Sequence, residues 1–269
     1  MNSQPGPVRR TSKEQFDSQA GHYDAQWARW TDESLGAMFS LYAPQPEDVV
    51  LDVATGTGYT ALGFAPLVNK IVAADISSGM LAQARRNAYL RSINNIRFCE
   101  TTAETMPFMD RSFSLVTCRI AAHHFVSIPE FLSESYRVLR DGGRLLLADT
   151  AVPDEDEASD WQNRLELVRD PSHIGNLSEQ QWRKHLLSEG FEIHSLSILQ
   201  AAVPIEVRDW MVKAGCNEEQ KQNVLGMLAT APKSAVDHFR IHAVEADWRL
   251  SWYRVVACAR KTRRDDGGP

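Results

Sequence analysis

Two acidic residues and two glycines have the spacing of a binding loop. Asp52 lies in the short apolar run Val49–Val53, and Gly56 and Gly58 follow it directly. Glycines between a strand and a helix let a ligand approach the backbone closely, and the first helical turn presents free N–H groups. Asp75 ends the next apolar run, where its oxygens can accept both hydroxyls of a ribose. The segment therefore predicts a site for a ligand that contains a nucleoside.

The glycine loop alone fits more than one such ligand. The segment from Gly56 to Ala61 also matches the GxGxxA form of a dinucleotide fingerprint, so a nicotinamide-dependent oxidoreductase is an alternative. Asp52 favours a different ligand, because a carboxylate before the loop would repel a pyrophosphate. S-adenosylmethionine (SAM) has no phosphate and brings a cationic ammonium and sulfonium, which suit an acid at this place. Alternatively, Asp52 has a purely structural role, in which its carboxylate caps the end of the strand by accepting hydrogen bonds from nearby backbone N–H groups.

Two adjacent histidines are the candidate catalytic groups. Arg119, His123 and His124 follow a later apolar run, at the strand ends where α/β folds place their ligands. Methyl transfer from SAM is an in-line displacement, so a protein base is needed only where the attacking group must lose a proton. We expect His124, then His123, to be that base, and packing with backbone hydrogen bonds is the equal alternative. Arg119 can reach the SAM carboxylate or an acidic substrate, or form a surface ion pair.

The elements that position these residues alternate between strand and helix. Short apolar runs predict strands at 49–53, 70–75, 96–99, 113–119, 144–148, 191–199 and 250–260. Helices are expected at 59–68 and 128–139, with Ser77 and Ser178 as N-caps of two more, and Asp141–Gly143 is expected to be a turn. The βαβ order predicts a parallel sheet with right-handed crossovers.

The chain is expected to divide into three parts. Residues 1–43 carry aromatic side chains in a helical pattern and are expected to form an N-terminal helical lid. Residues 44–150 hold the alternating pattern and the binding loop, so they form the cofactor-binding core. Residues 151–269 complete the sheet, with a mainly helical cap inserted at about 204–247.

Four segments in order resemble the motifs of class I SAM-dependent methyltransferases. They are Val50–Gly58, Ala73–Ser77, Thr102–Val116 and Arg137–Leu145, which together span the core. The start of the chain, from Phe16 to Asp24, resembles the subgroup that contains the ubiquinone/menaquinone C-methyltransferases. The resemblance implies a Rossmann-like α/β fold, with a seven-stranded, mostly parallel sheet, helices on both faces, an N-terminal helical lid and a helical cap insert.

The resemblance also implies which residues bind the cofactor. The glycine-loop backbone would line the methionyl part, Asp52 would lie near the ammonium, and Asp75 would take the ribose diol. The full implied set is Asp52, Ala54, Thr55, Gly56, Gly58, Asp75, Ile76, Met80, Thr102, Ala103, Glu104, Arg119 and, from the lid, Tyr23.

Two positions depart from the family pattern. Many relatives carry an aspartate where this chain has Thr102, so a hydrogen bond to the adenine amino group can be lost. Ala54 replaces the more usual glycine of the loop.

The resemblance also implies contacts to the adenine. Ile76 and Met80 are expected to lie against it, and the Ala103 backbone N–H is expected to bind its ring.

The leading functional hypothesis is methyl transfer from SAM to a small-molecule acceptor. One alternative keeps SAM but lets its own amino group attack another carbon of SAM, an internal cyclisation that releases methylthioadenosine. A nicotinamide-dependent oxidoreductase and a non-catalytic SAM-binding module are the remaining alternatives.

The composition of the chain limits the kinds of partner that we expect it to bind. The 269 residues include 29 basic and 35 acidic ones, for a formal net charge of −6, which argues against a nucleic-acid partner. Four dispersed cysteines form no CxxC pair, and the histidine pair has no third ligand at a recognisable spacing, so we expect reduced thiols and no metal. The polar N-terminus and the lack of a long apolar run favour a cytoplasmic protein away from membranes, either monomer or homodimer.

Overall fold

The computed structural model describes residues 10–19 and 28–262 of the chain. Short 3₁₀ turns occur at Ala65–Leu67 and Ala122–His124. The helices are α1 Ser12–Gln19, α2 Ala28–Leu41, α3 Tyr59–Phe64, α4 Ser78–Leu90, α5 Ile128–Val138, α6 Asp156–Arg169, α7 Glu179–Ser188, α8 Val207–Lys213, α9 Glu218–Ala229 and α10 Lys233–Phe239. The strands are β1 Val49–Val53, β2 Lys70–Asp75, β3 Ile96–Glu100, β4 Phe113–Arg119, β5 Leu139–Ala151, β6 Phe191–Gln200, β7 Ile205–Glu206, β8 His242–Val244, β9 Asp247–Leu250 and β10 Tyr253–Lys261.

The main sheet has seven strands in the order β3-β2-β1-β4-β5-β10-β6. Strands β1 to β5 pair in parallel, and β10 inserts antiparallel between β5 and β6. Strand order reverses beside β1, so the carboxyl ends of β1 and β4 flank the crevice where such sheets bind ligands. This topology confirms the predicted Rossmann-like class I fold.

The two faces of the sheet carry separate apolar cores. Along β1, Leu51 and Val53 belong to one core and Val50 to the other, as the alternation of side chains along a strand requires. The first core includes Phe131 of α5, and the second includes Met38 of α2. Helices on both faces therefore bury the parallel strands, which explains why their sequences are almost continuously apolar.

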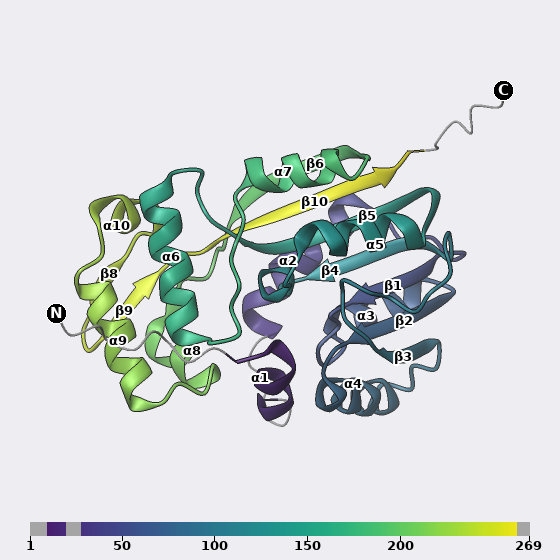
Figure 1. Ribbon diagram of the computed structural model, residues 1–269. Coiled ribbons are helices and arrows are strands. Elements are labelled where there is room, and N and C mark those ends of the chain that lie inside the picture. The colour runs from purple at the N-terminus through teal and green to yellow at the C-terminus, as the bar shows by residue number, and fades with distance from the viewer. Residues whose placement is uncertain (1–9, 20–27, 263–269) are drawn as a thin grey trace.

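A third core holds the cap, which comprises α6, α8, α9, α10 and the three-stranded sheet β7-β9-β8. Its aromatic centre is Phe239, whose ring lies 4.9 Å from that of Trp252 and 5.9 Å from that of Trp161. Figure 1 shows these elements gathered at one end of the molecule, away from β3 and α4. The cap extends the carboxyl-terminal side of the main sheet.

The structure corrects three expectations about local structure. The segment expected to be mainly helical also contains β7, β8 and β9, whose two to four residues are too short to give an alternating pattern. The last strand begins at Tyr253 because Leu250 belongs to β9 and pairs with Ile205. The expected turn at Asp141–Gly143 is an irregular stretch inside β5, where the register with β4 shifts.

The glycines of that stretch explain why it stays within the strand. Gly142 has a φ of +78°, which side chains other than glycine rarely adopt. A Cβ on Gly143 would lie 2.9 Å from the carbonyl oxygen of Arg140. The same glycine signal that predicts a turn therefore permits a bulge in a continuous strand.

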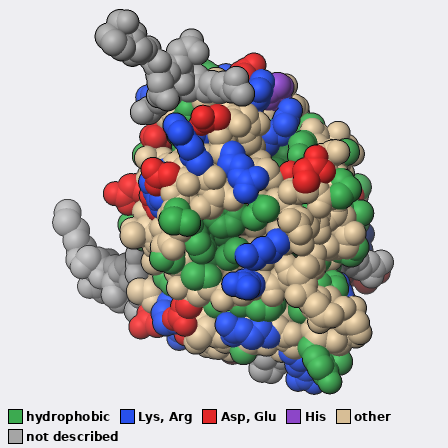
Figure 2. Space-filling model, turned by 90° about the vertical axis from the view of Figure 1, so that its right-hand side faces the viewer, with side chains coloured by type: hydrophobic (Ala, Val, Ile, Leu, Met, Phe, Trp, Pro, Cys, Tyr) green, Lys and Arg blue, Asp and Glu red, His purple; other side chains and the backbone are tan. Residues whose placement is uncertain are grey.

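The surface mixes charge and apolar atoms. Figure 2 shows the side on which the carboxyl end of β10 lies, with Lys and Arg side chains scattered among hydrophobic and uncharged atoms. Across residues 10–19 and 28–262, no helix combines the length and the hydrophobicity that a membrane span needs.

Candidate cofactor and substrate site

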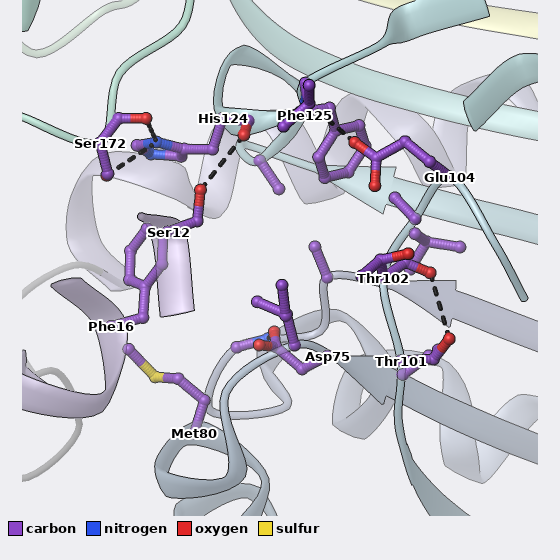
Figure 3. Close-up of a pocket in the computed structure, with 18 of the residues that line it drawn as sticks. Ser12, Phe16, Asp75, Met80, Thr101, Thr102, Glu104, His124, Phe125 and Ser172 are labelled. Atoms are coloured by element: carbon purple, nitrogen blue, oxygen red, sulfur yellow. Dashed lines mark hydrogen bonds between the residues drawn. The ribbon is translucent and has the colours of Figure 1, made fainter. Parts of the chain in front are cut away.

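A cavity of about 390 Å³ lies at the carboxyl ends of β1, β2 and β4. Its walls come from α1, the glycine loop, the end of β2, the segment after β3 and the segment after β4. Figure 3 shows Asp75 and Met80 on one side of this space, Thr101 and Thr102 on another, and His124 beside Ser172 across from them. Residues remote in sequence therefore meet at one edge of the sheet.

The glycine loop turns sharply through left-handed backbone conformations. Ala54, Gly56 and Gly58 have φ values of 53°, 56° and 88°. A Cβ on Gly58 would lie 3.1 Å from the Cβ of Ala84 in α4, whereas one on Gly56 would meet nothing within 4 Å. Gly58 thus lets α3 and α4 pack closely, and Gly56 leaves open space next to the cavity that it lines.

Asp75 is held at the cavity wall by two backbone N–H groups. Its Oδ2 accepts from the N–H of Gly56 at 2.8 Å, and its Oδ1 accepts from the N–H of Ser77 at 2.9 Å. Burial raises the pKa of this carboxyl, although the two N–H donors oppose the rise. Each oxygen keeps a further lone pair, so the carboxylate can still accept hydroxyl groups from a ligand.

Asp52 lies beneath the glycine loop, outside the residues that line the cavity. Its side chain accepts from the hydroxyl of Thr55 at 2.6 Å and from that of Thr117 at 2.7 Å. Burial raises the pKa of this carboxyl to about 6, against the effect of these two hydroxyls and of Arg119. Asp52 therefore links the glycine loop to β4 through these two hydrogen bonds. Thr55 is the residue of the loop that takes part in this link.

The expected adenine-side residues come together on one wall. Ile76, Met80, Thr102, Ala103 and Glu104 all line the cavity. The carboxylate of Glu104 accepts from the backbone N–H of Val126 at 2.9 Å, which joins the segment after β3 to the one after β4.

His124 lines the cavity, and its contacts indicate which ring nitrogen carries the proton. Its Nδ1 lies 3.2 Å from the carbonyl oxygen of Ser172 and 3.1 Å from the hydroxyl of the same residue. A carbonyl oxygen only accepts, so Nδ1 carries the proton and Nε2 of the neutral ring carries a lone pair. Burial, and then the charge of His123, lower the pKa of His124 to about 4. His124 is therefore neutral near pH 7.

His123 lies behind His124, and its ring is held by an acid. Its Nδ1 lies 2.6 Å from a carboxylate oxygen of Asp149, whose other oxygen accepts from the His123 backbone N–H at 2.8 Å. Burial opposes a charge on this imidazole, but Asp149 outweighs burial, so the pKa of His123 is raised. Asp149 was not among the predicted site residues, although an acid directly after the predicted strand 144–148 is a signal that could have identified it.

A third histidine completes this cluster. The ring of His173 lies 5.6 Å from that of His123, and its Nε2 lies 3.0 Å from the Oδ1 of Asn163. Burial, followed by the charges of the two other histidines, lowers the pKa of His173 to about 2. Its neutral ring packs on the paired His123.

Helix α1 covers one side of the cavity. The ring of Phe16 meets that of His124 edge-on at 4.9 Å, and the hydroxyl of Ser12 donates to the His124 carbonyl at 3.2 Å. Asp17 accepts from the hydroxyl of Ser77 at 2.5 Å. The expected lid contact Tyr23 lies outside the described residues.

Arg119 lies beside the glycine loop, away from the cavity lining. Its Nε donates to the hydroxyl of Thr60 at 2.8 Å, and its guanidinium lies 4.9 Å from the ring centre of Tyr59. Both partners lie in the first turn of α3, so the structure places Arg119 behind the start of that helix.

Comparisons with known proteins agree with this architecture. Residues 51–147 match a family described as a methyltransferase domain. The chain is 32% identical over 231 residues to the uncharacterized methyltransferase YcgJ of Bacillus subtilis (strain 168), covering 86% of this chain and 90% of YcgJ. It is 35% identical over 153 residues to the demethylmenaquinone methyltransferase of Symbiobacterium thermophilum, which covers 52% of this chain and 59% of that protein.

Solved structures extend the similarity to three dimensions. The crystal structure of YcgJ matches with a TM-score of 0.82 at 29% identity, over 86% of this chain and 99% of that one. A structure from Bacillus halodurans C-125 matches with a TM-score of 0.81 at 34% identity, over 86% and 100% of the two chains. This chain belongs to the SAM-dependent methyltransferases. Its cofactor is therefore SAM, and the oxidoreductase alternative falls away.

The depressed pKa of His173 predicts a stability that depends on pH. In the unfolded chain this histidine takes up a proton below about pH 6.5, whereas the folded chain resists it down to about pH 2. The unfolded state binds more protons in this window, so stability falls as the pH falls. At pH 5 the loss from this one group is about 2 kcal/mol.

We expect His173→Gln to reduce the drop in free energy of unfolding between about pH 7.5 and pH 5, measured by urea denaturation. His194→Gln, which changes an exposed histidine of β6, is the control and should keep the wild-type drop. An undiminished drop in His173→Gln would contradict the assignment.

Proposed function

We propose that this methyltransferase acts on a small-molecule acceptor bound in the cavity next to His124. The observation that carries this proposal is the cavity itself, which extends from Asp75 to His124 and is covered by α1. Its lining is mainly apolar with a few polar groups, a composition typical of sites for small organic ligands. The net charge of −6 adds no support for a nucleic-acid substrate.

The cavity residues fit the cofactor. Asp75 offers a carboxylate to the ribose hydroxyls, and Ile76 and Met80 offer apolar contact to the adenine. Thr102, Ala103 and Glu104 close the adenine end. The backbone of Gly56 has open space beside it, which suits close approach of the methionyl part. Ala54 also lines the cavity, whereas Asp52, Thr55, Gly58 and Arg119 support the loop from outside the lining. A contact from Tyr23 stays a prediction, because that residue lies outside the described ones.

When bound, SAM supplies a methyl group already activated by its sulfonium. The chain's own residues orient the acceptor and exclude water, because α1 and the Glu104–Val126 contact close the cavity walls. His124 is buried and neutral, with its Nε2 lone pair available. We assign it to accept the proton that the acceptor loses, with His123 held behind it by Asp149.

Product analysis tests the function directly. The protein is incubated with SAM alone and then with SAM and a fractionated cell extract, and the sulfur-containing products are identified by mass spectrometry. We expect S-adenosylhomocysteine together with a methylated molecule of low molecular mass, only when extract is present. Methylthioadenosine from SAM alone would show internal cyclisation instead, and methylated macromolecules alone would reject the small-molecule acceptor.

Asp75→Ala is expected to weaken SAM binding at least tenfold, or about 1.4 kcal/mol. The physical reason is the loss of a buried acceptor that also fixes the Gly56 backbone. Isothermal titration calorimetry gives the Kd, and Asp160→Ala, which removes an exposed acid from α6, serves as the control. Equal affinity in wild type and Asp75→Ala would remove Asp75 from the cofactor site.

His124→Gln is expected to lower kcat about 100-fold for an acceptor that must lose a proton, with little change in the Kd for SAM. The glutamine amide can still donate to the Ser172 carbonyl, so the local fold is kept. His242→Gln, at an exposed site in β8, should leave both constants unchanged. An unaltered kcat in His124→Gln would exclude it as the base.

A further inference from the structure

The turn that follows α6 lies against the two adjacent histidines. Asp170 is the residue at which α6 ends, and its carbonyl accepts from the backbone N–H of His173 at 3.0 Å, which closes a four-residue turn. Just beyond the turn, the N–H of Ile174 donates to the carbonyl of His123 at 2.9 Å. A segment that comes from the cap is therefore fixed along the chain that carries His123 and His124.

Asp170 holds Ser172, the third residue of this turn, by two hydrogen bonds. Its Oδ1 accepts from the backbone N–H of Ser172 at 2.9 Å and from the hydroxyl of the same residue at 2.7 Å. Asp170 is 4% exposed and Ser172 is 1% exposed, so solvent competes little for these contacts. The two bonds fix both the direction of the Ser172 hydroxyl and the position of its backbone.

The ionisation of Asp170 decides which way the hydroxyl donates. Burial raises the pKa of this carboxyl, but the charge that His124 gains in acid, the Arg169 guanidinium and the two Ser172 donors outweigh burial and lower the pKa to about 2. Asp170 is therefore a carboxylate near pH 7, and a carboxylate only accepts hydrogen bonds. The contact uses the single hydroxyl proton of Ser172, so the hydroxyl oxygen offers only lone pairs to other groups.

Nδ1 of His124 faces two such acceptors. The hydroxyl oxygen of Ser172 lies 3.1 Å from it and the carbonyl oxygen of Ser172 lies 3.2 Å from it (Figure 3). Both contacts favour the tautomer in which Nδ1 carries the proton. In the absence of Asp170 the Ser172 hydroxyl can turn its proton toward Nδ1. That hydrogen bond would favour the other tautomer, whose Nε2 is already protonated and accepts nothing.

We propose that Asp170 is a positioning residue for methyl transfer, which acts through Ser172 to keep Nε2 of His124 unprotonated. The inference rests on the proposed function, in which His124 is the base. In that reaction the attacking atom of the acceptor bonds to the methyl group as the methyl–sulfur bond breaks, and the proton that the acceptor loses passes to Nε2. Ser172 and His124 line the cavity, whereas Asp170 acts from outside the lining.

Nuclear magnetic resonance of wild type tests the tautomer directly. Protonated and unprotonated ring nitrogens of histidine resonate in well-separated ranges, so the isotope-labelled protein is measured near neutral pH without a ligand. The signals of His124 are assigned by their loss in His124→Gln. We expect Nδ1 in the protonated range and Nε2 in the unprotonated range. A proton on Nε2 in wild type overturns the proposal without any variant.

Two variants test the route through the hydroxyl. In Asp170→Ala we expect the Nε2 signal of His124 to shift toward the protonated range, because the Ser172 hydroxyl is released. Adding Ser172→Ala should return the signal, since the carbonyl at position 172 still accepts from Nδ1 and no hydroxyl remains to donate. Asp160→Ala, at an exposed site in α6, is the control and should match wild type. An unshifted signal in Asp170→Ala, or a shift that persists in the double variant, rejects the proposal.

Kinetics separates positioning from a merely structural role. With saturating SAM and the extract fraction that supplies the acceptor, we expect Asp170→Ala to lower the maximum rate of S-adenosylhomocysteine formation about tenfold. The Kd for SAM, measured by calorimetry, should stay within about twofold of wild type, and the double variant should regain part of the rate. Equal rates in wild type and Asp170→Ala would contradict the assignment.

The two kinds of failure can be told apart. If the proposed function is wrong, wild type transfers no methyl group to a small molecule, whatever the state of its histidine ring. If only the positioning is wrong, wild type is active but the ring signals of His124 are those of the other tautomer or do not respond to Asp170→Ala. Far-ultraviolet circular dichroism checks the fold of each variant, and if Asp170→Ala does not fold, the wild-type spectrum decides.

Discussion

The buried carboxylate of Asp52 is the contact on which the binding edge of this fold depends. It accepts hydroxyls from Thr55 in the glycine loop and Thr117 in β4, so one side chain joins β1, the loop and the neighbouring strand. Strand order reverses at this place, and the crevice that results is the one that holds ligands in open α/β sheets. A raised pKa, to about 6, is the electrostatic cost of placing a carboxylate there.

Electrostatics also gives the three clustered histidines different protonation states. Burial keeps His124 and His173 neutral, while the Asp149 carboxylate favours the charged form of His123. Because the rings of His123 and His124 are only 4.2 Å apart, charge on one disfavours charge on the other. The neutral ring, which lines the cavity, is therefore kept neutral partly by the residue behind it.

Much of the fold could be predicted from sequence because its signals are local. The apolar run of β1 and the N-caps at Ser77 and Ser178 are each set by residues close in the chain, and the structure confirms all three. The short strands of the cap were not predicted, because they form only by pairing with one another across the cap. Asp149 and Ser172 were not predicted as site residues for a similar reason, since only the packing of distant strands and loops brings them next to the two histidines.

The contact between α1 and the start of α4 joins the helix that covers the cavity to the wall that carries Asp75. Ser77 donates its hydroxyl to Asp17 of α1 and its backbone N–H to Asp75, so one residue serves both the cover and the ligand-facing acid. Moving α1 aside breaks the first of these bonds and frees the N-cap of α4 from its neighbour. An opening on this side of the cavity would therefore disturb the start of α4 as well, and openings of this kind limit the rate of many enzymes more than the chemistry does.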